Sequence, residues 1–285
     1  FRTITAPKRE LKAAQRWMLR TITEKLPVHG AAHGFLPSRS IVTNARAHVG
    51  AHTVVNVDVK DFFPTITWKR VRGLYRKAGL PEQVATLLAL LATESPREVV
   101  QFRGKTHYVA AGERALPQGA PTSPAITNAI CMRLDRRMSG LARRFGFRYT
   151  RYADDLTFSW RVPADAAEGT HPKAPVGMLL RGIGQILRAE GFQLHPTKTK
   201  VLRPGNRQTV TGLVINDAPD GASDVRVPRE VRRRLKAAIY NREKGRGGKE
   251  GETLAQLKGM AAYVYMTDAK LGRHYLDRIA KLEGA

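Results

Sequence analysis

The sequence is poor in cysteine, in acidic residues and in long apolar runs. A single cysteine, Cys131, among 285 residues excludes an internal disulfide framework and favours a reducing cytosol. Its apolar neighbours Ile130 and Met132 indicate a buried structural thiol rather than a nucleophile. No apolar run approaches the length of a membrane span, and no signal peptide is visible. We therefore expect a cytoplasmic protein with no membrane partner.

The shortage of acidic residues leaves a large positive charge. The chain has 24 Asp and Glu against 49 Lys and Arg, so its formal net charge is +25. Such an excess is more than solubility needs and points to a polyanionic partner, most simply nucleic acid. A basic proteome that favours arginine would explain only part of it. Because the chain starts at Phe1 rather than Met, we expect native sequence to precede it.

The apolar pattern predicts a mixed α+β body followed by a helical appendage. Ser123 is the expected N-cap of one helix, with Pro124 at its first helical position. From Pro228 onward the pattern is helical, with a break at residues 245–248, so we place a domain boundary between residues 225 and 226. Helices are expected over residues 11–26, 81–92, 123–144 and 176–190, strands over residues 53–59, 200–202 and 209–215, and a hairpin over residues 99–110.

Residues 151–155 read Arg-Tyr-Ala-Asp-Asp. The runs on either side, residues 147–152 and 156–160, are rich in β-branched and aromatic residues, which predicts a hairpin. Two adjacent carboxylates at a hairpin tip repel each other, and a cation held between them would relieve the repulsion. Asp154 and Asp155 therefore suggest metal-dependent chemistry.

A third carboxylate, Asp58, ends the strand predicted over residues 53–59, on the same face as Val54 and Asn56. Aspartate is disfavoured in a strand, and alone it would be read as a solvated edge residue. Together with Asp154 and Asp155 it completes a set that can hold two Mg²⁺ ions about 3.5–4 Å apart, as in phosphoryl transfer. Mg²⁺ prefers oxygen ligands and keeps waters and phosphates in its shell, so few protein ligands are needed. No His/Cys cluster with zinc spacing competes.

Residues 116–124 read Leu-Pro-Gln-Gly-Ala-Pro-Thr-Ser-Pro. Gly119 permits close approach of the backbone to a ligand, and the Gln118 amide offers both a donor and an acceptor to a sugar or base. A rigid proline-rich loop that caps the next helix explains this segment equally well.

In this order, the segments resemble a reverse transcriptase: Asn-Val-Asp-Val-Lys-Asp-Phe-Phe at 56–63, then residues 116–124, then Tyr-Ala-Asp-Asp at 152–155. The resemblance covers nearly the whole chain. It implies an α+β right-hand polymerase fold, in which residues 1–225 form interleaved fingers and palm, with an antiparallel sheet plus helices, and residues 226–285 form a helical thumb. It also implies an RNA-directed DNA polymerase that uses dNTPs and two Mg²⁺ ions.

The resemblance assigns roles to the residues around these acids. Asp58, Asp154 and Asp155 are implied to be the metal-binding catalytic acids, and Val59 to offer its backbone carbonyl to one metal. Gln118 and Gly119 would line the incoming nucleotide.

The resemblance also implies roles for several single residues and for one hairpin. Phe63 lies where the family places an aromatic gate against a 2′-hydroxyl, although an ordinary core aromatic is the alternative. Arg2 would grip the triphosphate. Lys198 matches a lysine that protonates departing pyrophosphate, a reasonable general acid, and a surface lysine near a basic loop is rated equally. The hairpin expected over residues 209–215 would hold the primer end, and His195 is expected to be structural.

Two short segments are similar to signatures of bacterial retron reverse transcriptases: residues 44–48, with Asn44 and His48, and Val210-Thr211-Gly212. These enzymes bind a structured non-coding RNA, prime from the 2′-hydroxyl of an internal guanosine and produce multicopy single-stranded DNA. They commonly act in phage defence with an effector protein. The alternatives are a group II intron-type or other bacterial reverse transcriptase and, in another class, a catalytically silent RNA-binding protein.

The stretch 226–249 carries ten basic residues, among them Arg232, Arg233 and Arg234, against only Glu230 and Glu243. A helix this basic would follow phosphates. By the resemblance it is the thumb, which in retrons also recognises an RNA stem-loop, and duplex RNA is read mostly through shape and backbone. The alternative is a solvated charged face.

Overall fold

The computed structural model describes residues 5–163, 173–216, 224–246 and 252–283. The helices are α1 (Arg9–Thr21), η1 (Thr23–Lys25), α2 (Ile41–Arg46), α3 (Trp68–Lys77), α4 (Glu82–Ala92), α5 (Ser123–Ile130), α6 (Met132–Arg144), α7 (Val176–Ala189), α8 (Arg229–Glu243), α9 (Leu254–Tyr265) and α10 (Ala269–Lys281). The strands are β1 (Thr53–Lys60), β2 (Arg97–Phe102), β3 (Lys105–Ala110), β4 (Phe147–Tyr152), β5 (Asp155–Trp160), β6 (Gln193–Leu194), β7 (Lys200–Leu202), β8 (Thr209–Val210) and β9 (Leu213–Val214).

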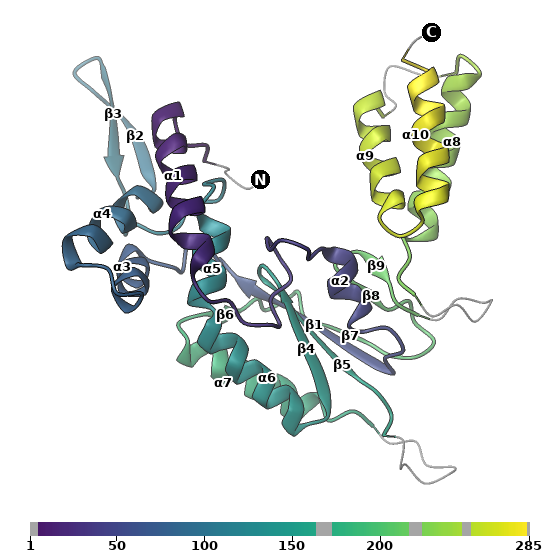
Figure 1. Ribbon diagram of the computed structural model, residues 1–285, viewed down its shortest axis with the longest axis horizontal. Helices are drawn as coiled ribbons and strands as arrows, with labels where there is room; N and C mark the ends of the chain where they lie inside the picture. The colour runs from purple at the N-terminus through teal and green to yellow at the C-terminus, as the bar shows by residue number, and fades with distance from the viewer. Residues whose placement is uncertain (1–4, 164–172, 217–223, 247–251, 284–285) are drawn as a thin grey trace.

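An antiparallel sheet built around β1 forms the centre of the fold. The order is β4-β5-β1-β6, and β7 also pairs with β1. Successive side chains of a strand point to opposite faces. Val55, Val57 and Val59 are accordingly buried in one core, which helices α6 and α7 complete below the sheet in Figure 1. Asn56 and Asp58 point to the other face and are half-buried. Asn56 and Asp58 therefore lie on the side away from that core.

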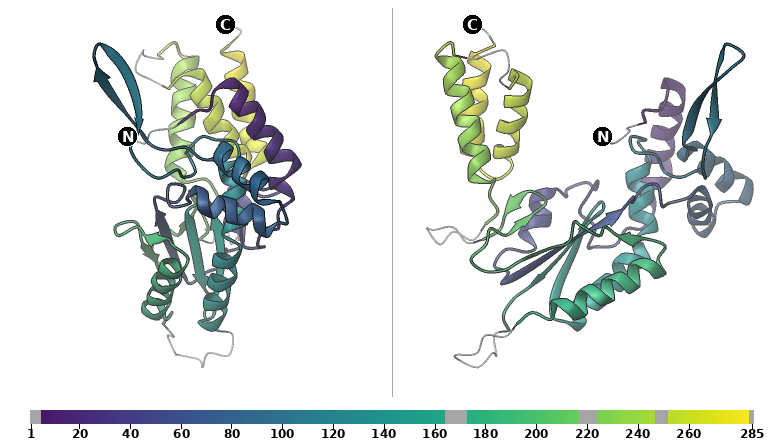
Figure 2. Two further views of the ribbon diagram at one scale, coloured as in Figure 1. Left: turned by 90° about the vertical axis from the view of Figure 1, so that its left-hand side faces the viewer. Right: turned by 180° about the vertical axis from the view of Figure 1, so that it is seen from behind.

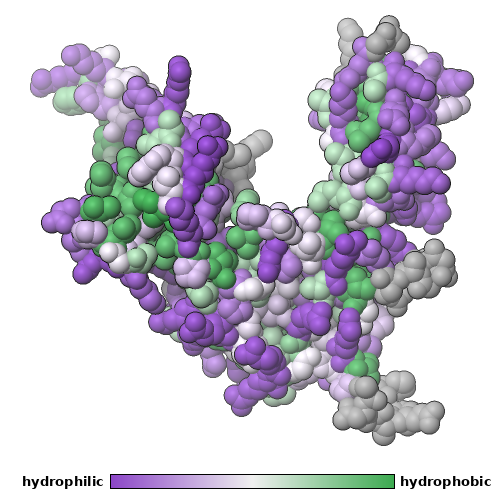
Figure 3. Space-filling model, in the orientation of Figure 1, coloured by the Kyte–Doolittle hydropathy of each residue, from purple (hydrophilic) through white to green (hydrophobic). Residues whose placement is uncertain are grey.

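Two arms rise from the sheet on either side of a hollow (Figures 1 and 2). One arm holds α1, α3, α4, α5 and the β2–β3 hairpin, and the other holds α8, α9 and α10. The space-filling view shows the hollow open between them (Figure 3). A second apolar cluster joins α2 and the β8–β9 hairpin to the thumb helices, through Val42, Val210, Leu213, Leu235 and Leu257 among others. The boundary expected at residues 225 and 226 stays a prediction.

The structure follows most of the expected elements and departs from some. The helix expected over residues 11–26 is α1, which ends at Thr21, followed by the separate 3₁₀ helix η1. The helix expected over residues 123–144 is two helices, because Cys131 has a ψ of 1°, far from the helical value, although its N–H still bonds Thr127. Thr122 rather than Ser123 is the N-cap. The hairpin expected over residues 209–215 is confirmed: β8 pairs with β9, and the chain turns at Thr211 and Gly212.

Cys131 is fully buried, as expected, and burial raises the pKa of its thiol to about 12. Such a thiol is not a nucleophile at neutral pH. In the part of the chain that the structure describes, no helix has the length and apolar character needed to cross a membrane.

Candidate active site

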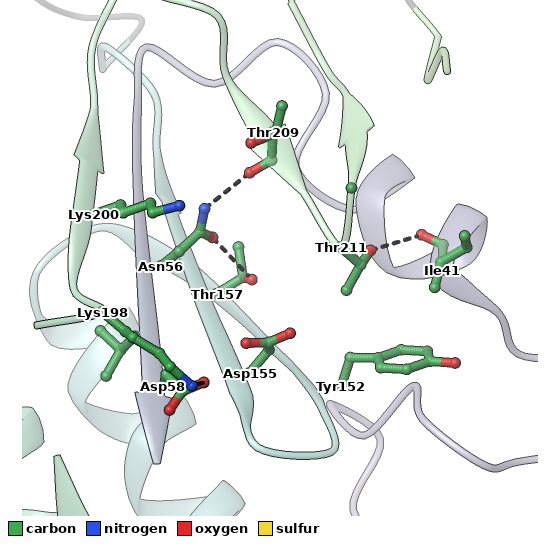
Figure 4. A pocket seen from close by; sticks show the side chains of 12 residues that line it. Ile41, Asn56, Asp58, Tyr152, Asp155, Thr157, Lys198, Lys200, Thr209 and Thr211 are labelled. Carbon is green, nitrogen blue, oxygen red and sulfur yellow. Dashed lines mark hydrogen bonds and ion pairs between the residues drawn. The ribbon is translucent and has the colours of Figure 1, made fainter. Parts of the chain in front are cut away.

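Two of the predicted acids face each other directly across the sheet. In the antiparallel pairing of β1 with β5, Asp58 lies opposite Asp155, and the N–H of Val59 donates to the carbonyl of Asp154 at 3.1 Å. Like charges in directly opposed strand positions destabilise a sheet. The ammonium group of Lys198 lies 3.0 Å from Oδ2 of Asp58, so a cation does accompany these acids (Figure 4).

Asp154 and Asp155 occupy different positions in the β4–β5 hairpin, one in the turn and one at the start of the second strand. Tyr152 pairs with Asp155, so Ala153 and Asp154 form a two-residue turn and Asp155 is the first residue of β5. Ala153 has a φ of +55°, as the first central residue of a type II′ hairpin turn requires. Glycine is the residue that adopts this region without cost, and a left-handed alanine costs about 1–2 kcal/mol. The surrounding structure must therefore hold this turn.

A buried ion pair lies beneath the turn. Arg151 and Asp135 are both fully buried, and the guanidinium donates twice to the carboxylate, with Nε–Oδ1 and Nη2–Oδ2 distances of 2.8 and 2.7 Å. Its remaining Nη1 donates to Oδ1 of Asn128 at 3.0 Å and to the carbonyl of Ala153 at 3.3 Å. The hydroxyl of Tyr149 donates to Asp135 at 2.8 Å. The ion pair is thus fully hydrogen-bonded and reaches the turn itself.

Gly34 packs against the same turn from the other side. A Cβ at this position would lie 2.9 Å from the backbone nitrogen of Ala153, closer than real Cβ contacts allow. The Gly34 carbonyl accepts from Nδ2 of Asn128 at 2.9 Å, and His33 N–H donates to the carbonyl of Arg151 at 2.7 Å. Sequence reasoning missed this support, because its members come from separate elements and no motif joins them.

Two cavities meet at the acids. The larger has a volume of about 760 Å³ and the smaller about 410 Å³, and both are lined by Asp58 and Lys198. The larger cavity brings Asp154 together with three of the residues predicted to meet a nucleotide, and the smaller brings together Asp155 and the β8–β9 turn. The lining of the larger includes Val59, Phe63, Gln118, Gly119 and Asp154, and that of the smaller includes Asn56, Asp155, Thr157, Thr211 and Gly212.

The larger cavity is shaped by residues with special backbone or packing. Gly119 has a φ of +122°, which only glycine adopts readily, and the carbonyl of Gln118 accepts from Thr5 N–H at 2.8 Å. Phe62 is a buried core aromatic, and Phe63 meets it edge-on with ring centroids 5.7 Å apart while facing the cavity. Arg2 lies outside the described residues.

The smaller cavity is walled by the β8–β9 hairpin (Figure 4). Hydrogen bonds to three neighbouring parts of the protein hold the hairpin in place. Asn56 donates to the carbonyl of Thr209 at 2.9 Å and accepts from Thr157 at 3.2 Å. The hydroxyl of Thr211 donates to the carbonyl of Ile41 at 3.3 Å. The hydroxyl of Tyr263 in α9 donates to the carbonyl of Gly212 at 3.0 Å. The hairpin is therefore tied to the sheet, to α2 and to the thumb.

Three residues expected to contact RNA lie inside the protein. Asn44 is 0% exposed, His48 1% and Val210 0%. The His48 ring nitrogens lie 2.7 Å from the hydroxyls of Ser159 and Thr150, and burial, then Arg148, lowers the pKa of His48 to about 3. A side chain without exposed surface does not touch RNA. This corrects the expectation of direct contact: His48 fastens the end of α2 to the sheet, and Val210 belongs to the second core.

The predicted basic face of the thumb lies on α8. Arg233 and Arg234 are exposed and Arg232 is half-buried. Arg234 forms an ion pair with Glu252. Part of the expected positive charge is therefore neutralised within the thumb.

The site offers oxygen donors to a metal ion. Within the described residues, no three His, Cys, Asp or Glu side chains converge closely enough to hold a metal by themselves. The acidic side chains that line the two cavities include Asp58, Asp154 and Asp155, and carboxylate oxygens suit a hard cation such as Mg²⁺. The ammonium of Lys198 beside Asp58 shows that this carboxylate accommodates a cation. The donor chemistry thus fits the expected group.

Comparison with known proteins identifies the family. The family model described as reverse transcriptase (RNA-dependent DNA polymerase) matches residues 1–232. The retron Ec86 reverse transcriptase of Escherichia coli is 32% identical over 283 residues, which cover 99% of this chain and 77% of that protein. The chain belongs to the retron reverse transcriptases.

Two other relatives come from Myxococcus xanthus. This reverse transcriptase is 61% identical over 282 residues to the retron Mx162 reverse transcriptase and 45% identical over 280 residues to the retron Mx65 reverse transcriptase. The alignments cover 99% and 98% of this chain, but only 58% and 60% of those proteins. The chain thus spans about three fifths of the length of these two relatives. Among solved structures, a Candida albicans telomerase matches with a TM-score of 0.46 and 12% identity, over 97% of this chain and 47% of that one.

The fold class expected from the sequence is confirmed. A palm sheet with α6 and α7 beneath it carries a fingers arm and a helical thumb, which is the right-hand arrangement of the family.

Proposed function

We propose that this reverse transcriptase is an RNA-directed DNA polymerase that copies a structured non-coding RNA into multicopy single-stranded DNA. The observation that carries the proposal is the direct opposition of Asp58 and Asp155 between two cavities. One cavity gathers the residues expected to meet a nucleotide, and the other is walled by the hairpin expected to hold the primer. A binding protein without catalysis has no need of opposed acids at such a junction.

In this proposal Asp58, Asp154 and Asp155 hold two Mg²⁺ ions, with the carbonyl of Val59 as a further ligand. When bound, the ions supply positive charge to the attacking and leaving oxygens of nucleotidyl transfer. The protein positions the acids by the β1–β5 pairing and by the support beneath the turn.

The larger cavity would receive the dNTP. Gln118 and Gly119 line it, and the absence of a side chain at Gly119 lets the backbone approach the nucleotide closely. Phe63 would exclude a 2′-hydroxyl, and Arg2 would grip the triphosphate. Lys198 would give a proton to departing pyrophosphate, which its place in both cavities supports.

The smaller cavity would receive the primer end, held by the turn at Thr211 and Gly212. In the retron reading the primer is the 2′-hydroxyl of an internal guanosine, and the thumb binds an RNA stem-loop through Arg232, Arg233 and Arg234. A role in phage defence with an effector protein is proposed on family membership alone.

Primer extension with the cognate RNA, dNTPs and Mg²⁺ tests the proposal. We expect DNA joined to RNA through a 2′–5′ linkage, and no product from the double variant Asp154→Asn, Asp155→Asn. A product from that variant would contradict the metal assignment. DNA made without a branched linkage would favour a group II intron-type enzyme, and RNA binding without dNTP incorporation would favour the silent binding protein.

The thumb assignment has its own test. Neutralising Arg232 and Arg233 to Gln should weaken RNA binding and make its salt dependence shallower. Neutralising Arg234, whose charge Glu252 already balances, should have a smaller effect. Equal salt slopes for all variants would show that these arginines do not meet phosphate.

A further inference from the structure

One face of helix α1 carries a row of basic side chains directed away from the core. Residues spaced three or four apart share a helix face, and the members of this row follow one another at intervals of three, four and four. All of them are exposed. The opposite face holds the buried Gln15 and Met18, and Gln15 donates to the carbonyl of Leu91 at 2.8 Å, which fixes α1 against the end of α4. The row consists of Arg9, Lys12, Arg16 and Arg20.

The protein does not neutralise this row. Over the described ranges, no carboxylate forms an ion pair with any of its four members, whereas arginines of the same arm, such as Arg72 and Arg76, pair with Glu82. The one acidic residue in α1 is Glu10. With a rise of 1.5 Å per residue, the row extends over about 16 Å. It is long enough to meet several phosphates of one strand.

An exposed tryptophan lies beside the row. Trp17 is 60% exposed, although tryptophan is usually highly buried. A basic surface combined with an aromatic platform is the arrangement by which proteins bind single-stranded nucleic acid, because every base offers a face for stacking. A duplex would meet the cations but would leave the ring without an unpaired base.

The position of this row in the fold also suits contact with a strand of nucleic acid. Helix α1 stands in the fingers arm across the hollow from the thumb (Figures 1 and 2), and hydrophilic side chains gather over it at the rim of the hollow (Figure 3). A strand that leaves the hollow on this side would pass the exposed face of α1.

We infer that the exposed face of α1 binds the unpaired part of the nucleic-acid strand outside the active site. The row contacts its phosphates and Trp17 stacks on one of its bases. This inference rests on the proposed function, under which that strand is the template RNA before it is copied.

Fluorescence anisotropy with two labelled RNA–DNA duplexes tests the inference, one blunt and one with a single-stranded RNA overhang, without dNTPs or Mg²⁺. The test variant changes Arg9, Lys12, Arg16 and Arg20 to Gln. A matched control changes four exposed basic residues of α6 and α7, under the sheet, to Gln: Arg136, Arg143, Arg181 and Arg188. Circular dichroism melting establishes that each variant is folded.

We expect the test variant to lose the affinity that the overhang adds and to keep its affinity for the blunt duplex. Its salt slope with the overhang should be shallower by up to about 3, because each single-strand phosphate contact contributes about 0.7. Trp17→Ala should weaken overhang binding at least about fivefold. The control should keep the overhang effect.

Equal losses of affinity for the two duplexes, or equal losses of affinity in the test and control variants, would overturn the inference and favour an effect of net charge alone. An unchanged overhang effect would overturn it outright. Primer extension by the wild-type protein is scored separately. If the wild type fails to incorporate dNTPs but shows the α1-dependent overhang effect, the proposed function fails and the binding surface stands. If it polymerises and the overhang effect is unchanged, only the binding surface fails.

Discussion

Asp58 and Asp155 lie directly opposite each other on neighbouring antiparallel strands, and the ammonium of Lys198 lies 3.0 Å from the Asp58 carboxylate. The Asp58 side chain is only 13% exposed, so water screens this charge poorly. The ammonium group of Lys198 thus takes the position beside Asp58 that a metal ion would occupy. A bound metal ion and the Lys198 ammonium would compete for the same carboxylate oxygen.

Replacing Lys198 should therefore strengthen metal binding in the absence of substrate. In Lys198→Met, added Mg²⁺ should raise the melting temperature more than in the wild type. A tenfold gain in affinity corresponds to about 1.4 kcal/mol of added stability at saturating metal. The matched control is Lys200→Met, because Lys200 lines the same cavity, whereas the ion pair of Asp58 is with Lys198. Equal Mg²⁺-induced shifts in all three proteins would contradict the competition.

Gly34 should be required for the conformation of the Tyr-Ala-Asp-Asp turn. In Gly34→Ala the new methyl group would lie 2.9 Å from the nitrogen of Ala153, so the turn must shift. We expect a loss of about 1–3 kcal/mol in urea unfolding and a fall in nucleotide turnover. Gly30→Ala is the control, because a Cβ there meets no atom within 4 Å. Full turnover in Gly34→Ala would show that the turn tolerates the displacement.

Variants of the buried pair Arg151–Asp135 should change stability and nucleotide turnover independently of each other. Asp135→Asn should cost about 3–5 kcal/mol, because Arg151 remains buried with its charge uncompensated. The double variant Arg151→Met, Asp135→Leu should recover much of that loss in urea unfolding. Its turnover should remain low, because the guanidinium also donates to the carbonyl of Ala153. Recovery of both stability and turnover would show that the pair does not position the turn.

These residues mark the limit of what the sequence predicts. The sequence predicts Asp58, Asp154 and Asp155 as one site, because an acid in a strand and two adjacent acids in a hairpin are unfavourable unless they have a function. The pairing of β1 with β5 does place Asp58 opposite Asp155. Arg151 could not be identified as buried, because it is one of 49 Lys and Arg residues and its partner Asp135 lies in another element.

The burial of residues in the segments similar to retron signatures could not be predicted from the sequence either. Asn44 and His48 belong to a segment similar to a retron signature, and that resemblance implied contact with RNA, but the packing of α2 on the sheet encloses both. The break at Cys131 has no sequence signal, since neither glycine nor proline lies there.

Phe63 should control the choice between dNTP and rNTP. Phe63→Ala removes a ring that faces the larger cavity, so rNTP incorporation should rise relative to dNTP incorporation. Phe192→Ala is the control, because Phe192 is a buried core aromatic that lines neither cavity, so its loss should cost about 3–5 kcal/mol of stability without changing the ratio. The measurement is kcat/KM for each nucleotide in single-nucleotide extension. An unchanged ratio in Phe63→Ala would assign Phe63 to packing.

His48 should make the fold less stable as the pH falls. Its folded pKa is about 3, lowered by burial and then by Arg148, whereas an unfolded histidine titrates near 6.5. Between these values the unfolded state binds one more proton, so the free energy of unfolding falls as the pH drops, by up to about 1.4 kcal/mol per unit. His33, with a pKa of about 4, acts in the same direction over part of this window.

The variant His48→Gln isolates this contribution. Between pH 6.5 and 4.5, the free energy of unfolding in urea should fall less steeply with decreasing pH for this variant than for the wild type. The two slopes should differ by up to about 1.4 kcal/mol per pH unit, the value for one proton. His107→Gln is the matched control for the loss of one histidine, because His107 lies on the exposed β2–β3 hairpin. If His48→Gln and the wild type lose stability in parallel, His48 takes up a proton inside the folded protein, and its hydrogen bonds to Ser159 and Thr150 must then rearrange in acid.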